Sequence, residues 1–258
     1  MSPPLFWVDD VPGDPDSVVH LGGDEGRHAV TVTRVGVGEQ IIVSDGAGTA
    51  ALCEVTGTVG KAALDARVLD VVITPAPVPK VIVVQALPKS ERSELAVDLA
   101  TEAGVDVVVP WQSARCVAKW VGAKSDKGVA KWRSAASSAA KQSRRAHIPD
   151  VTPLATTREV TARAQSVVEG GGVVAVLHEG ASASLRSLPL STAEEIMLVV
   201  GPEGGLDDSE IAALIAIGAT SVLLGPEVLR TSSAAAVALG AIGALTSRWD
   251  VTAGWRST

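Results

Sequence analysis

The chain of 258 residues is poor in cysteine and aromatic residues, and it has no long apolar run. Its two cysteines, Cys53 and Cys116, stand in no C-x-x-C or histidine-rich context, so we expect neither a disulfide framework nor a metal site. No segment approaches the roughly 18 uncharged apolar residues of a membrane span. No basic region precedes an apolar run near Met1, which argues against a signal peptide. We therefore expect a cytoplasmic protein without a membrane span.

The composition is that of a globular protein with a core of small side chains. Hydrophobic residues make up 47% of the chain and charged residues 20%, which is ordinary for a folded domain. Aromatic residues reach only 3%, so the core must consist mostly of small and branched aliphatic residues. The length is sufficient for one large domain or two smaller ones.

The charge is unevenly distributed along the chain. The net charge is −7, which by itself argues against a nucleic-acid partner. Between Arg115 and His147, however, nine lysines or arginines occur with one acid, Asp126. Such a basic block on an acidic body can bind a phosphate backbone. It can equally be the solvated face of a helix, and charge alone does not decide between the two.

The first part of the chain is expected to be rich in β-structure. Short apolar runs at residues 5–8, 41–44, 50–55 and 63–73 are separated by turns rich in glycine and aspartate. Three prolines then follow within residues 74–79, a composition typical of a stiff extended connector. We therefore divide the chain into domains at residues 1–74 and 75–258.

The second part alternates apolar strands with helices. Strands are expected at residues 81–87, 105–110, 173–178, 196–200 and 221–224. Helices are expected at residues 90–103 with Ser90 as the N-cap, and at residues 125–142, 157–169, 207–217 and 231–249. Asp207 and Glu210 have the spacing of a capping box. This alternation predicts an α/β fold with a parallel sheet covered on both faces, in which ligands bind at the carboxyl ends of the strands.

Three of these strands lead into unusual loops, at residues 177–180, 200–206 and 223–234. Glycine lets the backbone approach a ligand closely, and proline stiffens the turn, so the three loops together could hold an adenine and a ribose through backbone groups. The alternative for any one loop is a tight turn with no ligand. The chain has neither a P-loop nor a G-x-G-x-x-G that opens a helix, so an ordinary nucleotide site is not expected.

The loop sequences carry a resemblance to a known family. Gly201-Pro-Glu-Gly-Gly205 and Leu224-Gly-Pro-Glu-Val-Leu-Arg-Thr231 resemble the signature of the RsmE family of 16S ribosomal RNA uridine-N3 methyltransferases, which belong to the SPOUT class. Weaker matches lie at residues 27–34, 89–92, 102–105, 115–116, 131–132 and 142–149. The likeness covers nearly the whole chain. It departs from the family at Thr33, where an aliphatic residue is usual, and at Lys141, where an acid is common.

The resemblance implies a fold that strand patterns do not give. The C-terminal domain would be a SPOUT-type α/β domain with a trefoil knot, which forms the S-adenosylmethionine pocket. The N-terminal domain would be a small PUA-like β-barrel that binds RNA. The family is homodimeric, and the last helix carries many small residues suited to close contact with another helix. Packing of that helix inside one subunit is the alternative.

The activity implied is transfer of a methyl group from S-adenosylmethionine to N3 of a uridine in 16S ribosomal RNA of the small subunit. N3 must lose its proton, so positioning, a base and stabilisation of negative charge are the expected contributions to catalysis. Arg230 follows the cofactor loop and would supply positive charge, with a structural ion pair as the alternative. Glu203 would orient the base or accept the proton. Alternatively, it caps the amides of its own loop.

The remaining site residues follow from the same match. The expected cofactor contacts are Leu177, His178, Glu179, Gly180, Val200, Gly201, Gly204, Leu224, Gly225, Leu229 and Thr231. His178 could instead be an ordinary histidine at the end of a strand. The expected RNA contacts are Arg34, Lys89, Arg92, Arg115 and Arg145, and binding through phosphates should weaken with salt.

Three other functions remain open on the sequence. The chain could be a non-catalytic RNA-binding or assembly factor of the same fold, which the intact loop motifs argue against. It could be a nucleotide-dependent transferase, although the P-loop lysine and metal-ligating acids are missing. It could also methylate another RNA, such as transfer RNA, or a ribose 2′-hydroxyl.

Overall fold

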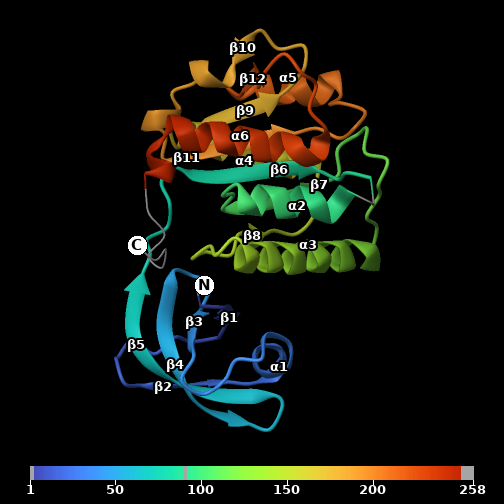
Figure 1. Ribbon diagram of the computed structural model, residues 1–258. Coiled ribbons are helices and arrows are strands. Elements are labelled where there is room, and N and C mark those ends of the chain that lie inside the picture. The colour runs from blue at the N-terminus through green and yellow to red at the C-terminus, as the bar shows by residue number, and fades with distance from the viewer. Residues whose placement is uncertain (1–2, 90–91, 251–258) are drawn as a thin grey trace. The chain divides into compact units, whose positions relative to one another are not determined.

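The computed structural model describes residues 3–89 and 92–250, and these form two compact units (Figure 1). The first unit contains the described residues up to Ala76 together with Lys141–Ile148. The second contains Pro77–Ala140 and the described residues from Pro149 onward. The mixed α/β class expected from the sequence is confirmed, and each unit has its own buried aliphatic core.

The first unit is built on a five-stranded sheet. Its spatial order is β1-β3-β4-β5-β2, and β1 and β3 are parallel whereas the other pairs are antiparallel. The β4–β5 register shifts at Leu52/Cys53 and again at Val55/Gly57, and bulges of this kind bend a sheet. The strands are β1 (Leu5–Trp7), β2 (Val18–Leu21), β3 (Gln40–Ser44), β4 (Thr49–Val59) and β5 (Ala63–Ile73).

A helical connection between β2 and β3 is not predicted by the sequence pattern. It consists of α1 (Gly23–Arg27) and a π-helical turn, η1 (His28–Thr33), which ends at Arg34 with a left-handed φ of 60°. Gly26 is required there, because a Cβ atom would lie 2.4 Å from the Leu21 carbonyl oxygen. Only Gly26 and Ala29 are buried in this stretch, so it has no amphipathic pattern that could be recognised.

The segment 141–148 belongs to the first unit, although its first two residues are the end of the long helix α3 (Ala123–Gln142), most of which belongs to the second. The Gly48 amide donates to the Ala146 carbonyl (3.0 Å), and the Ile148 amide donates to the Gly46 carbonyl (2.8 Å). Lys141 places its ammonium 2.6 Å from a Glu25 carboxylate oxygen and 5.1 Å from the centre of the Phe6 ring. The basic side chain at position 141 therefore has a structural role within the first unit.

The second unit is built on a seven-stranded sheet, and all its neighbouring strands are parallel. The spatial order is β10-β12-β9-β11-β6-β7-β8. This confirms the predicted parallel sheet, and the short strands β8 and β10 extend it beyond the prediction. The strands are β6 (Lys80–Ala86), β7 (Val107–Trp111), β8 (Asp150–Val151), β9 (Val173–Leu177), β10 (Ala183–Ser184), β11 (Glu195–Val200) and β12 (Thr220–Leu223).

Helices cover both faces of this sheet, as predicted. Helices α2 and α6 pack together over β6 and β11 on one face, and α4 and α5 pack over β9, β11 and β12 on the other (Figure 1). The capping box at Asp207 and Glu210 is present, and Thr156 and Glu159 form another. The helices are α2 (Ser93–Glu102), α3 (Ala123–Gln142), α4 (Thr157–Glu169), α5 (Asp208–Ala216) and α6 (Thr231–Leu245), with short 3₁₀ turns η3 (Leu185–Ser187) and η4 (Leu190–Thr192).

Several predicted helix boundaries differ from the structure, among them the start of α3, which is Ala123 rather than Ser125. The helix expected to start at Ser90 begins at Ser93, and Ser90 itself lies outside the described residues. The last helix ends at Leu245 rather than at Trp249, because Thr246 is extended and a 3₁₀ turn, η5 (Ser247–Trp249), follows.

The end of the last helix is fixed by packing and by an ion pair. The indole of Trp249 folds back onto Gly243, where a Cβ atom would lie 2.3 Å from the ring. Arg248 donates to the Asp106 carboxylate at 2.7 Å and to the Gly104 and Pro79 carbonyls. Its side chain is only 6% exposed, so a paired charge anchors the segment just after α6 inside the second unit.

Helix α6 buries half of its alanines and glycines within its own subunit. Ala234, Ala235, Ala238 and Gly243 are buried, and α6 packs on α2. The segment 224–230 brings the chain from β12 to α6, which covers β11 and β6. The trefoil knot that the family resemblance implies for this region stays a prediction. No helix in the described part of the chain is long and apolar enough to cross a membrane.

Candidate functional site

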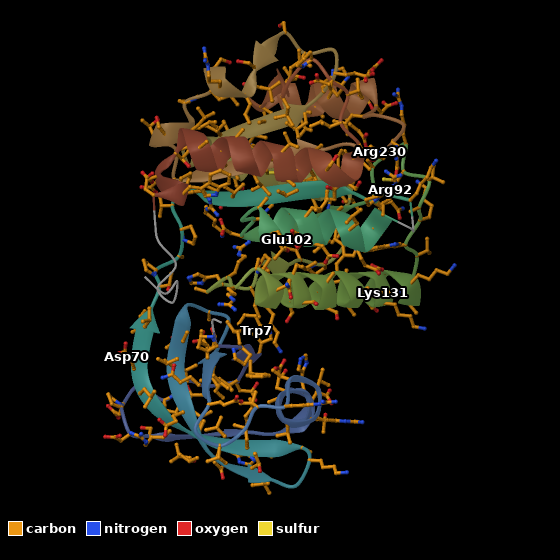
Figure 2. The ribbon with its side chains drawn as sticks, viewed as in Figure 1. Trp7, Asp70, Arg92, Glu102, Lys131 and Arg230 are labelled. Carbon is orange, nitrogen blue, oxygen red and sulfur yellow. The ribbon has the colours of Figure 1, made fainter. Side chains whose placement is uncertain are left out.

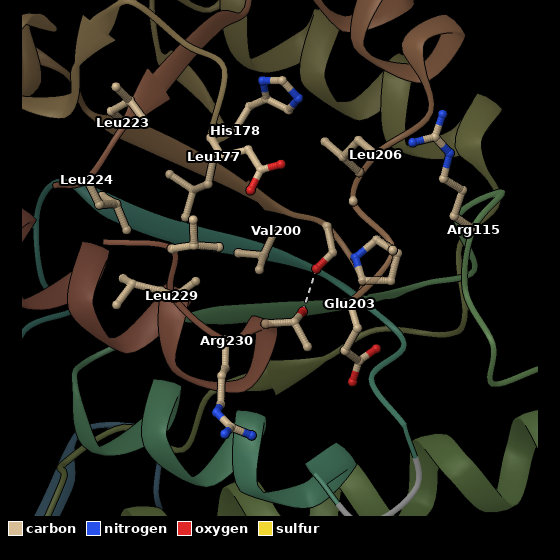
Figure 3. Close-up of a pocket in the computed structure, with 18 of the residues that line it drawn as sticks. Arg115, Leu177, His178, Val200, Glu203, Leu206, Leu223, Leu224, Leu229 and Arg230 are labelled. Carbon is tan, nitrogen blue, oxygen red and sulfur yellow. Dashed lines mark hydrogen bonds between the residues drawn. The ribbon is translucent and has the colours of Figure 1, made fainter. Parts of the chain in front are cut away.

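A cavity of about 690 Å³ lies where β9, β11 and β12 end in the second unit (Figure 3). This is the carboxyl edge of the parallel sheet, where ligands bind in folds of this kind. Residues of all three glycine-containing loops line it. The lining consists of Lys89, Arg92, Arg115, Leu177, His178, Glu179, Val200, Gly201, Pro202, Glu203, Gly204, Gly205, Leu206, Asp208, Val222, Leu223, Leu224, Gly225, Glu227, Val228, Leu229, Arg230, Thr231 and Ala234.

One wall of the cavity is apolar. Leu177, Leu224 and Leu229 gather beside Val200, each of them from the end of a strand or from the loop that follows it (Figure 3). Leu206 is 3% exposed and supports Gly201, whose Cβ position lies 3.0 Å from the Leu206 side chain. A side chain at position 201 would therefore have to displace this leucine. Such a wall suits the flat apolar face of a base or a similar ligand.

A hydrogen bond closes the floor between two of the loops. The Thr231 hydroxyl donates to the Gly201 carbonyl, which joins the first turn of α6 to the end of β11 (Figure 3). Thr231 is 7% exposed, so this bond is screened from water. The two loops are thus held at a fixed separation although the bonded residues are 30 positions apart in the sequence.

The opposite side of the cavity is charged. Glu203 is exposed, and its carboxylate accepts the backbone amide of Lys89 at 3.0 Å. The amide that it caps therefore belongs to the loop after β6 and not to its own loop, which corrects the alternative drawn from the sequence. This bond brings Lys89 to the edge of the cavity beside the loop after β11.

Arg115 lies on the same side (Figure 3), and its guanidinium pairs with the Asp207 carboxylate at 3.3 Å. Hydrogen bonds from the hydroxyl and amide of Ser209, together with Arg115, hold the pKa of the Asp207 carboxyl below its ordinary value. Glu210, which is 4% exposed, accepts the Ala114 amide at 2.9 Å. This buried carboxylate therefore fixes the loop that carries Arg115. The sequence predicted only its other role, in the capping box of α5.

Arg230 occupies the junction between the last loop and α6. Its carbonyl accepts hydrogen bonds from the amides of Ser233 and Ala234, and these bonds fix its backbone at the first turn of the helix. Its exposed side chain extends away from the leucine wall (Figure 3). Among the described residues it makes no ion pair, so the structural ion pair considered from the sequence is not present.

His178 and Gly180 form a turn of their own. The Gly180 amide donates to the His178 ring nitrogen Nδ1 at 3.1 Å, and His178 also pairs its backbone amide with the Val222 carbonyl. His178 and Glu179 line the cavity, whereas Gly180 does not. The histidine therefore has a local structural role in addition to its place at the cavity wall.

The basic residues expected to contact RNA lie in both units. Lys89, Arg92 and Arg115 line the cavity, and Figure 2 shows Arg92 at the same end of the second unit as Arg230. Arg34 and Arg145 belong to the first unit. Among the described residues, no group of three histidine, cysteine or acidic side chains is arranged to hold a metal ion.

Sequence reasoning did not single out several lining residues. Leu206, Val222 and Ala234 are buried aliphatic residues whose pattern is that of any core position, so no signal distinguishes them. Pro202 and Gly205 lie inside the loop motif and could have been included on that ground.

Two family models match this chain. An RNA methyltransferase domain covers residues 74–243, and an RNA methyltransferase PUA domain covers residues 21–69. The first therefore spans the parallel sheet and its cavity, and the second spans most of the five-stranded sheet.

Similar proteins share these two parts. The ribosomal RNA small subunit methyltransferase E of Mycobacterium tuberculosis (strain CDC 1551 / Oshkosh) is 53% identical over 96% of this chain and 94% of its own length. That of Bacillus subtilis (strain 168) is 32% identical over 86% of this chain and 88% of its own. A crystal structure of the protein of the same name from Neisseria gonorrhoeae, bound to S-adenosylmethionine, matches with a TM-score of 0.84 and 25% identity, covering 95% of this chain and 98% of that one.

Proposed function

The chain belongs to the ribosomal RNA small subunit methyltransferase E family, and from this premise we propose that it methylates N3 of a uridine in 16S ribosomal RNA. The methyl donor is S-adenosylmethionine. The observation that carries the proposal is the cavity at the carboxyl edge of the sheet, where a leucine wall faces a charged rim that includes Arg230. An apolar surface for the donor and a cation for the reacting base lie side by side there.

The residues of the cavity fit the cofactor. A volume of about 690 Å³ is within the range of sites for small ligands of this size. We assign the cofactor contacts to Leu177, Val200, Leu224 and Leu229 on the apolar wall, with Gly201 and Thr231 on the floor. The rest of the predicted set lies beside them at His178, Glu179, Gly204 and Gly225. Gly180 acts through the turn that it forms with His178.

Catalysis then requires the chain to position the uracil base and to remove the proton from its N3 atom. When bound, S-adenosylmethionine supplies an electrophilic methyl group. Arg230 stabilises the negative charge that N3 and the flanking carbonyl oxygens carry once the N3 proton has left. Glu203 either orients the uracil or takes that proton. Glu203→Gln separates the two roles, because glutamine keeps a hydrogen-bonding group but cannot act as the base.

The RNA is proposed to contact both units. The second unit is the proposed methyltransferase domain, and the first unit, which includes Lys141–Ile148, is the proposed RNA-binding domain. Lys89, Arg92 and Arg115 bind phosphates at the rim of the cavity, and Arg34 and Arg145 bind them on the first unit. Because each phosphate contact releases counterions, affinity should fall steeply with salt.

A homodimer is also proposed, as the family resemblance implies. Leu95 on α2 and Val237 and Leu245 on α6 are 45%, 47% and 39% exposed, and the two helices pack together. Light scattering of the purified protein at micromolar concentration should give twice the mass of 26.3 kDa. A single-chain mass across the concentration range would contradict the dimer.

The decisive experiment has two steps. Calorimetric titration should show binding of S-adenosylmethionine, with ATP and NADH as controls that do not bind. Incubation with small-subunit RNA and isotopically labelled donor, followed by digestion to nucleosides, should then place the label on the uracil base. Label on a ribose would indicate a 2′-hydroxyl target, and RNA binding without cofactor binding would indicate an assembly factor.

A further inference from the structure

Gln85 is a polar residue inside an otherwise apolar strand. It lies near the end of β6, between Val200 of β11 and Pro110 of β7 in the sheet. Its side chain lies in the core, and the residue is 2% exposed. Burial of an amide in such surroundings is unfavourable unless its hydrogen bonds are made, so the partners of this side chain need an explanation.

The partners fix the direction of the amide. Its nitrogen Nε2 lies 3.0 Å from the Ala86 carbonyl oxygen and 3.2 Å from the Thr231 hydroxyl oxygen. A carbonyl can only accept, so the amide atom facing Ala86 must be the nitrogen. The second hydrogen of that nitrogen is then donated to Thr231, and the single hydroxyl hydrogen of Thr231 goes to the Gly201 carbonyl. The bonds run in one direction, from Gln85 through Thr231 to Gly201.

The oxygen of the Gln85 amide takes no part in this arrangement. Oε1 of Gln85 is buried and has no hydrogen-bond partner among the described residues. An unpaired buried acceptor lowers stability, and an apolar side chain of similar shape would avoid that cost. Among the described residues the side chain therefore acts through its nitrogen, and the bond to Thr231 is the one that leads to the cavity.

We propose that Gln85 is a positioning residue that sets the separation of the two cofactor loops from behind the cavity. It does not line the cavity, whereas Thr231 and Gly201 both do. By holding the Thr231 hydroxyl in one orientation, it keeps the start of α6 bonded to the end of β11. This inference rests on the proposed binding of S-adenosylmethionine in that cavity.

The test compares binding with stability in four variants. Gln85→Met keeps the shape and removes the donor, so the Kd for S-adenosylmethionine should rise about fivefold, the typical effect of one hydrogen bond. The thermal midpoint should stay the same or rise, and KM should change more than kcat. Thr231→Val should weaken binding at least as much, and Thr231→Ser, which keeps the hydroxyl, should bind more tightly than Thr231→Val. Gln165→Met makes the same chemical change on the exposed face of α4 and serves as the control.

The double variant tests the connection itself. If Gln85 acts through Thr231, then Gln85→Met with Thr231→Val should bind no worse than Thr231→Val alone. Additive losses would overturn the inference, as would unchanged binding by Gln85→Met or a loss that parallels a fall in thermal midpoint. Failure of the unaltered chain to bind S-adenosylmethionine would instead overturn the proposed function, and with it the role of Gln85.

Discussion

The two walls of the cavity differ in what holds them in place. The leucine wall is formed by residues at strand ends and is supported by core packing, as Leu206 shows beneath Gly201. The charged rim is held by hydrogen bonds between separate loops, from Lys89 to Glu203 and from Arg115 to Asp207. We therefore propose two separate roles, in which the packed wall binds the cofactor and the charged rim binds the RNA.

The strongest test of this division is Arg230→Ala. If the guanidinium stabilises charge on the reacting base, methyl transfer should fall by about two to three orders of magnitude. The Kd for S-adenosylmethionine should stay within about twofold, because the side chain extends away from the leucine wall. Single-turnover rates and calorimetry measure the two effects. Arg186→Ala, another exposed arginine of the second unit, is the control, and near-normal turnover in Arg230→Ala would refute the role.

Leu229→Ala should produce the converse pattern. Loss of part of the apolar wall should raise the Kd for S-adenosylmethionine about tenfold, in line with about 1.4 kcal/mol of lost burial. RNA affinity, measured by filter binding without cofactor, should not change. Ile215→Ala on α5 removes a 43% exposed aliphatic residue outside the cavity and is the control. A parallel loss of RNA affinity would mean that the two walls do not act separately.

Arg115→Ala should affect RNA binding moderately. One phosphate contact fewer should reduce the slope of log affinity against log salt by roughly one unit and weaken binding several-fold at low salt. The exposed pair with Asp207 should contribute little to folding, because solvent screens it. Binding titrations at two or more salt concentrations provide the measurement. An unchanged slope would remove Arg115 from the RNA surface.

The smallest expected effect is a loss of folding stability at acid pH, caused by protonation of Asp207 at the charged rim. The pKa of Asp207 is lowered in the folded state, chiefly by the Ser209 hydroxyl, so its contribution to stability is complete above the ordinary value of 3.8. That contribution is lost as the pH falls through the lowered pKa. Asp207→Asn keeps a capping side chain but does not titrate, so thermal midpoints of the two proteins should converge in acid. A constant difference from neutral to acid pH would contradict this assignment.

The parallel sheet could be predicted from the sequence because its signals are local. Continuous apolar runs gave β6, β9 and β11 to within about two residues, and the α4 boundaries were predicted without error. The helical connection before β3 was missed because close packing of Gly26, and not periodicity, determines it. The loop residues that the motifs predicted as site residues line the cavity except for Gly180, but Pro202 and Gly205 also line it and were not predicted. The Gln85–Thr231 bond could not be predicted, because its residues are 146 positions apart and no local sequence pattern connects them.

Helix α6 is held at both of its ends. Thr231 bonds to Gly201 at the start, and Arg248, just beyond the last turn, bonds to Asp106, Gly104 and Pro79. Helices usually fray from a free end, and their terminal amides then exchange hydrogen with solvent early. With both ends anchored, the amides of α6 should exchange together, through opening of the whole second unit. The floor of the cavity would then remain formed for as long as that unit stays folded.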